Sequence, residues 1–289
     1  MLALRRKVNG PEHTDTLKAM SGLASSYADA GRRDEALKLE EEILALRRKA
    51  NGPEHPDTLS AMRNLAISYL EDGRQGEATA LLEKVCELQP KNTDASLTLA
   101  TWQTWFGRDA DYEATRRRLV QWAEGTDQAS TAERAAKAYC LRPSTDEAML
   151  TKVRHLAQQA VKLGKSDPWL VYYRTALGLA EYRSGQYAAA EKVLSVAEQT
   201  AGDFQDPERI ARLFRAMSLF RQDKTEEARR LFGQAQAQMP PLPKDESKPV
   251  EDRSSFSPDV LITWLAYKEA KALIEPPSAP AAVPSVPAP

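Results

Sequence analysis

The sequence is short of several features that point to common classes of protein. Only two of its 289 residues are cysteines, Cys86 and Cys140, and they lie far apart. This excludes a disulfide framework and fits a reducing compartment. No apolar run approaches the roughly 18 residues that a membrane span needs. Glycine is scarce, at 13 residues, while Ala, Leu, Glu and Arg dominate. That composition favours helix over sheet, so we expect an all-α, cytoplasmic chain.

An excess of charge of either sign is also missing. The chain has 40 basic and 41 acidic residues, and its formal net charge is -1. A near-neutral chain gives no reason to expect nucleic acid or an anionic membrane as its main partner. No cluster of residues has the composition or spacing of a catalytic or metal site. We therefore expect no enzyme activity, metal, cofactor or small-molecule substrate.

What the sequence does contain is a long internal repeat. Residues 2–17 and 44–59 are identical at 14 of 16 positions, with an offset of 42 residues. Recurrence of this length marks a tandem array of structural units. Each unit consists of a helix, a short turn, a second helix and a longer turn, with apolar residues on one face of each helix. The first copy starts in the middle of a unit. We therefore expect residues 1–10 to be the second helix of a truncated repeat, and the chain to be a fragment of a longer protein.

Apolar periodicity and stop signals predict paired helices over residues 1–239. The expected helices span 14–30, 34–50, 58–72, 77–89, 92–106, 111–123, 130–141, 146–163, 168–183, 187–200, 207–222 and 225–238. Residues 240–256 hold four prolines and are expected to form a loop. Residues 257–275 contain a last helix, which Ser257-Pro258-Asp259 begins. The Pro/Ala-rich residues 276–289 are expected to be a disordered tail.

These units resemble tetratricopeptide repeats. The first two are similar to the 42-residue, kinesin-light-chain-like variety, through GPEHPDTL at 52–59 and NLAISY at 64–69, followed by Gly73 and by Glu77-Ala78. Later units resemble the shorter 34-residue form. The resemblance is strong over 1–90 and 168–239. It is weaker over 92–165, where Gln103, Tyr112 and Arg116 depart from the pattern. It implies a solenoid of about six helical hairpins with a C-terminal capping helix.

A second resemblance concerns the C-terminal half. TAERAAKAYCLRPS (131–144) and ARLFRAMSLFRQDKTEEARRLF (211–232) are similar to the repeat region that follows the kinase domain in large bacterial serine/threonine protein kinases. This resemblance implies an accessory segment of a signalling protein. The chain itself has no glycine-rich nucleotide loop, no HRD and no DFG.

The repeat resemblance also implies a concave groove lined by the first helix of each hairpin. Such a groove takes an extended peptide or a helix, so a protein partner is expected. The groove looks sparse in charge and moderately aromatic, which favours an internal segment of a partner over a free C-terminus. Two alternatives stay open: docking on or regulating a kinase domain of the same polypeptide, and ligand sensing. The residues expected to face a partner are Arg63, Asn64, Ile67, Thr101, Trp105, Tyr172 and Tyr182.

Several residue types that often carry chemistry are better explained as structural. His13 and His55 recur at one repeat position and are expected to belong to a turn, not to a metal site. Cys140 and Trp102 are expected in the core. The run 116–118 and Trp122 could contact phosphate and a base, but a solvated outer face is the better interpretation. The acidic run 40–42 is expected to be exposed.

The last hairpin is expected to need a cover. Its inward positions are apolar, and so much exposed apolar surface would be a liability. Helix 258–274 also has an apolar face and is expected to provide that cover. The positions to be covered are Ile210, Leu213, Phe214, Met217 and Phe220.

Overall fold

The computed structural model describes residues 2–250 and 257–276. Within these ranges the chain forms fourteen α-helices and no strand. Of the predicted tail at 276–289, residues 277–289 lie outside the described residues, and so do residues 251–256 at the end of the predicted loop. Because the described elements are all helices, the all-α class is confirmed.

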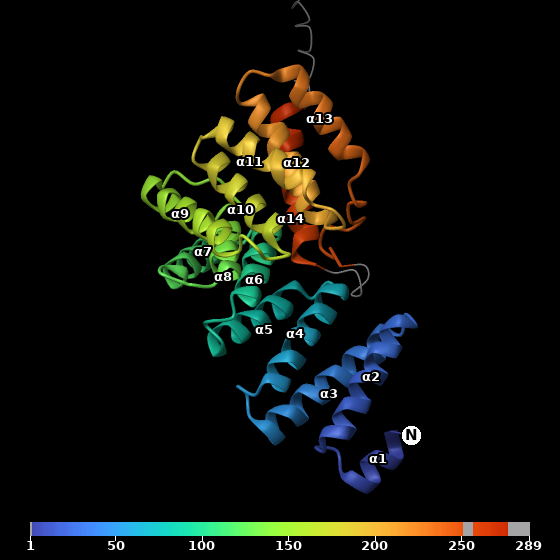
Figure 1. The fold of residues 1–289 in the computed structure, drawn as a ribbon. Helices are drawn as coiled ribbons and strands as arrows, with labels where there is room; N and C mark the ends of the chain where they lie inside the picture. Colours follow the sequence, from blue (N-terminus) through green and yellow to red (C-terminus); the bar gives the residue numbers. More distant parts are fainter. Residues whose placement is uncertain (1, 251–256, 277–289) are drawn as a thin grey trace, which may run out of the picture.

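Twelve of the helices form six antiparallel hairpins that stack in chain order (Figure 1). A single helix precedes them and another follows. The predicted bounds agree with the observed ones to within two residues. The helices are α1 (Leu2–Asn9), α2 (Thr14–Asp29), α3 (Arg33–Asn51), α4 (Pro56–Glu71), α5 (Gln75–Leu88), α6 (Thr93–Trp105), α7 (Asp109–Ala123), α8 (Ala129–Tyr139), α9 (Glu147–Leu163), α10 (Leu170–Arg183), α11 (Tyr187–Gln199), α12 (Gln205–Phe220), α13 (Thr225–Ala237) and α14 (Pro258–Ile274).

The motif repeated at 2–17 and 44–59 contains the end of a second helix and the start of the next first helix. His13 Nδ1 accepts a hydrogen bond from the backbone N–H of Asp15 at 3.2 Å, and His55 Nδ1 accepts one from Asp57 at 3.1 Å. Each histidine is thus the N-cap of its helix and satisfies a backbone donor that the helix leaves free. Gly52, with φ +85°, ends α3 in a conformation that favours glycine. The structural interpretation of both histidines is confirmed.

Small buried residues let the two helices of a hairpin approach closely. Ala66 and Ala78 do this in one hairpin, and Gly178 and Ala190 in a later one. At Gly178 the approach is so close that an added Cβ would lie 2.2 Å from Leu194 Cδ2. The core, which includes the fully buried Trp102, follows this seam along the stack.

Helix α14 covers the last hairpin, as expected, but it does not sit at the end of the stack. It lies on α12 and α13 and also reaches α6 of the third hairpin (Figure 1). The rings of Trp264 and Trp105 have centroids 5.7 Å apart. Residues 240–250 carry the chain back along the groove, where Trp105 Nε1 donates to Glu246 O at 2.9 Å. The stack curves enough for α6 and α12 to flank a single helix, which explains this placement.

Two of the predictions for charged side chains are wrong. Glu40 was expected in an exposed stripe but is only 8% exposed and accepts a hydrogen bond from Ser68 Oγ. Arg116 was expected on a solvated face but is 6% exposed, and its guanidinium lies 4.3 Å from the Tyr139 ring centre. In both cases the second helix turns this face toward the next first helix, since α3 packs on α4 and α7 on α8. Arg118 and Trp122 are exposed, as expected.

The close contact at Gly178 predicts opposite effects of one substitution at two helical glycines. Gly178→Ala forces the new methyl group into Leu194 and should lower the free energy of unfolding by about 1–3 kcal/mol. Gly22→Ala on the exposed face of α2 meets nothing within 4 Å and should raise it by up to about 1 kcal/mol. Urea denaturation of both variants measures this. Equal effects of the two changes would contradict the packing.

The burial of Trp264 predicts that α14 is integral to the fold. Trp264 is 7% exposed, so Trp264→Asp removes aromatic contacts and buries a charge. We expect a loss of about 3–5 kcal/mol and a melting temperature lower by several degrees. Trp122→Asp, at a tryptophan that is 39% exposed, is the matched control and should have little effect. An unchanged melting curve for Trp264→Asp would show that α14 does not dock as described.

Candidate functional site

The concave groove is divided into two halves. The first helices α6, α8, α10 and α12 pack side by side, and their half contains α14. We call it the occupied half. The first helices α2 and α4 do not pack on each other and are joined through α3. We call their concave side the open half. The seven predicted contact residues therefore do not form one site: Arg63, Asn64 and Ile67 lie in the open half, and the other four lie in the occupied half.

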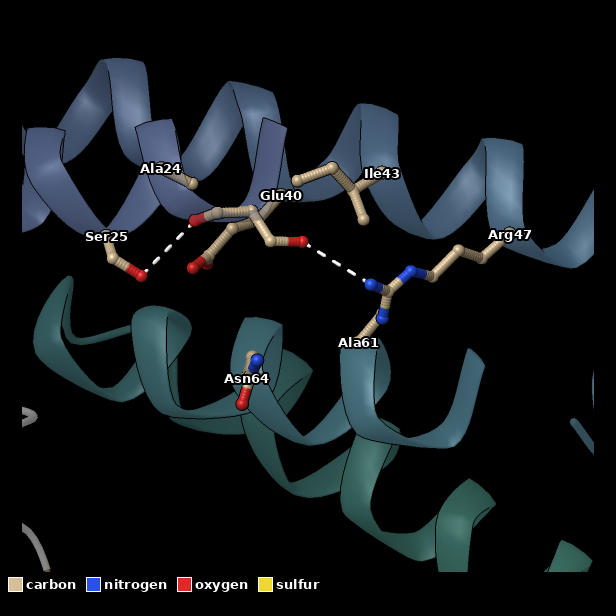
Figure 2. A pocket seen from close by; sticks show the side chains of 8 residues that line it. Ala24, Ser25, Glu40, Ile43, Arg47, Ala61 and Asn64 are labelled. Carbon is tan, nitrogen blue, oxygen red and sulfur yellow. Dashed lines mark hydrogen bonds between the residues drawn. The ribbon is translucent and has the colours of Figure 1, made fainter. Parts of the chain in front are cut away.

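The open half contains a small pocket between α2, α3 and α4 (Figure 2). Asn64 is exposed on α4 and lies across this pocket from Glu40 and Ser25 (Figure 2). Arg47 closes one side, where its Nη2 donates to Ser21 Oγ at 3.4 Å. The pocket thus presents amide, hydroxyl and guanidinium groups, which are suited to hydrogen bonds with a polypeptide backbone. Its volume is about 50 Å³, and it is lined by Ser21, Ala24, Ser25, Glu40, Ile43, Arg47, Ala61 and Asn64.

The other two predicted residues of α4, Arg63 and Ile67, are not among the residues that line this pocket. Arg63 Nη2 pairs with Asp94 Oδ2 at 2.8 Å, and both side chains are 43% exposed. Ile67 is half-buried and packs against the core of the N-terminal hairpins. The open half therefore offers an exposed amide, a solvent-accessible ion pair and an apolar patch.

The four predicted residues of the occupied half are largely covered. Thr101 is fully buried and donates its hydroxyl to Leu97 O at 2.9 Å. Tyr182 is 6% exposed. Trp105 and Tyr172 are half-buried, and Trp105 is the residue that contacts Trp264 of α14. In this half the chain's own helix occupies the place that a partner segment was expected to take.

Two buried ion pairs fix α14 in the groove. Arg183 of α10 makes a bidentate pair with Glu269, at 2.5 and 2.7 Å, and the Arg183 side chain is 3% exposed. Burial lowers the pKa of Arg183, but Glu269 more than offsets this and leaves it raised. Removing one partner of such a pair leaves an uncompensated buried charge, so the pairs fix the register of α14.

The second ion pair, between Lys137 and Asp259, is part of a triad that also includes Glu133. Lys137 Nζ of α8 lies 2.7 Å from Glu133 Oε1 and 3.0 Å from Asp259 Oδ1 at the start of α14. Burial raises the pKa of Glu133. Burial also acts to lower the pKa of Lys137, but the two carboxylates outweigh it and hold that pKa above its ordinary value.

Sequence reasoning missed these ion pairs because their partners lie far apart in the chain. Lys137 and Asp259 are 122 residues apart, and Arg183 and Glu269 are 86 apart. The available signal was local: a single charge on a helix face that otherwise reads as apolar. Such a charge is predicted to be buried, but the local sequence does not indicate which residue pairs with it.

The described residues contain no group of three or more His, Cys, Asp or Glu side chains that could hold a metal ion. Both cysteines are free and buried, which confirms Cys140 as a core residue. Burial raises the pKa of Cys140 to about 12 and also raises the pKa of Cys86. At neutral pH neither thiol is therefore a reactive thiolate. Across 2–250 and 257–276, every helix is too short or too polar to cross a membrane.

Comparison with solved structures adds support for the fold. A tetratricopeptide repeat protein from Parabacteroides merdae has a TM-score of 0.54 and 14% identity, over 89% of this chain and 93% of that chain. A putative kinesin light chain from Podosopora anserina with nearly identical TPR-like repeats has a TM-score of 0.40 and 20% identity, over 76% and 93%. Yeast Tom70 has a TM-score of 0.39 and 11% identity, over 91% and 61%. At these identities the first likeness shows the fold alone, and the two lower TM-scores add nothing to it.

Comparison with sequence families is more direct. No curated protein matches the chain. Family models described as tetratricopeptide repeats match residues 2–49, 15–91 and 175–243, which together are more than half of the chain. They cover the segments where the repeat pattern is strongest. The chain belongs to the tetratricopeptide repeat proteins.

Proposed function

We propose that the chain is a non-catalytic scaffold that binds a segment of another protein in the open half of its groove. Tetratricopeptide repeats generally mediate protein–protein interaction. The observation that carries the proposal for this chain is the position of α14. A helix of 17 residues lies against first helices in the occupied half, held by apolar contacts and two buried ion pairs. The open half is built from first helices of the same kind, and within residues 2–250 and 257–276 no helix lies against it as α14 does.

The chemistry of the open half favours an internal segment of the partner. Asn64 is exposed beside the hydroxyls of Ser21 and Ser25, and these groups match the donors and acceptors of a peptide backbone. The described residues that line the pocket include one basic side chain, Arg47, which does not make the ring of basic residues that clamps a terminal carboxylate. The buried, unpaired cysteines support a cytoplasmic location for this interaction.

The resemblance to kinase repeat regions defines an alternative. In that case the segment in the open half belongs to a catalytic domain of the same polypeptide. No contact described above favours it, so protein binding in trans is the function that we propose.

The proposal predicts that groove substitutions weaken binding of selected peptides. A library of random peptides is selected on the full chain, and affinities are measured by fluorescence anisotropy. Asn64→Ala and Arg63→Ala should each lower the affinity about 2- to 10-fold, because each removes hydrogen-bonding groups worth about 0.5–1.5 kcal/mol. Arg118→Ala, an exposed side chain on α7, is the matched control and should leave affinity unchanged. The proposal fails if no peptide is selected, or if the groove variants bind as well as the control does.

A further inference from the structure

A second cavity lies outside the open half, where α6, α8 and α10 meet the start of α14. Its volume is about 470 Å³, within the range typical of small-molecule sites. Ser257, Pro258 and Asp259 border it on one side. Its other lining residues are Asp94, Leu97, Ser130, Glu133, Arg134, Lys137, Asp167, Trp169, Tyr172 and Tyr173.

One wall of the cavity is aromatic and accessible. Trp169 is 51% exposed, although it is a large apolar residue. Its ring centroid lies 5.6 Å from that of Tyr172 and 5.3 Å from that of Phe204, so the three rings form one cluster. A half-exposed tryptophan held rigidly at the rim of a cavity is a feature of binding surfaces, where aromatic residues supply most of the contact energy.

The charge inside the cavity is negative and incompletely balanced. The buried triad sets the two carboxylates of Glu133 and Asp259 against one ammonium, that of Lys137. Over the whole lining there are four carboxylates and two cationic side chains, and Arg63 pairs with one of the four, Asp94, so one carboxylate remains in excess. Glu133 is 4% exposed, and its Oε1 contacts Lys137 Nζ but accepts no hydrogen bond of regular geometry from the described residues. A buried negative charge of this kind is stabilised by an added cation and destabilised by an anion.

Lys137 shows how this wall holds a cation. Its ammonium lies 5.2 Å from the centre of the Tyr172 ring, within the range of a cation–π contact, and also touches two carboxylates. The lining also contains Trp169 and Asp167, and no cationic side chain of the described residues lies over the Trp169 ring.

We propose that this cavity binds an organic cation, that is, an ammonium or guanidinium group on an apolar stem. The cation lies near Glu133 and Asp259, and the stem packs against Trp169. Such a group occurs on a free amine and on a lysine or arginine side chain of a polypeptide. The proposal does not rest on peptide binding by the open half, although Asp94 of this lining pairs with Arg63 there.

The test is calorimetric titration of the full chain with matched probes. n-Butylammonium and n-butylguanidinium are compared with 1-butanol, which has the same stem without the charge. In a second arm, acetyl-Ala-Lys-Ala-amide is compared with acetyl-Ala-Gln-Ala-amide. We expect the cationic member of each set to bind at least tenfold more tightly than its neutral counterpart. Binding of the free amines alone assigns the site to small molecules, and binding of the lysine peptide alone assigns it to a polypeptide side chain.

Variants locate the binding within the molecule. Trp169→Ala should lower the affinity for the bound cationic probe at least tenfold, and Trp169→Phe should restore most of it. Glu133→Gln should also weaken binding. Trp122→Ala removes a tryptophan on α7 that is 39% exposed, and it should have no effect. Because Trp169 is half-exposed, its loss should leave the melting curve nearly unchanged. The proposal is overturned if no cation binds, if the neutral probes bind equally well, or if Trp169→Ala binds like the unaltered chain.

Discussion

The close approach of each first helix to its second helix is the constraint on which the rest of the structure depends. Small residues occupy matched places in successive hairpins, such as Ala66 with Ala78 and Gly178 with Ala190. They fix the distance between the paired helices and therefore the angle at which one hairpin stacks on the next. Repeated along the chain, this geometry produces the curved stack. The curvature brings α6 and α12 to opposite sides of a space one helix wide, and α14 fills that space.

The two halves of the groove therefore differ in whether a helix of the chain covers them. In the occupied half, apolar contacts such as Trp105 with Trp264 stabilise α14, and the ion pairs at Lys137 and Arg183 fix its position. Buried ion pairs contribute little net stability, because desolvation offsets most of their attraction. Their effect is to exclude other registers, in which a charge would be buried alone. In the open half, α2 and α4 contact only α1, α3 and α5 among the described helices, and polar groups such as Asn64 stay exposed.

Local features of the sequence predicted the helices to within two residues, because caps, glycine stops and apolar periodicity all act over one or two turns. The histidine caps and the core positions of Trp102 and Cys140 follow from the same local signals. The positions of Glu40 and Arg116 were not predictable in this way, since each is buried by a neighbouring hairpin and not by its own helix. The placement of α14 was predicted only in part. Its apolar face indicated α12, but nothing local indicated α6, because their contact depends on the accumulated curvature of four hairpins.

The return of α14 to α6 changes how the molecule holds together as a whole. In a simple repeat array each unit touches only its neighbours, so stability is a sum of local terms and the array can unfold from either end. Here Trp105 contacts Glu246, which is 141 residues further along the chain. The segment after α13 therefore links the first of the last four hairpins to the last one. Among the described helices, α1 to α3 contact only one another and α4. The chain therefore joins a cooperative C-terminal block to an N-terminal arm that opens locally at lower free energy, and the open half of the groove begins in that arm.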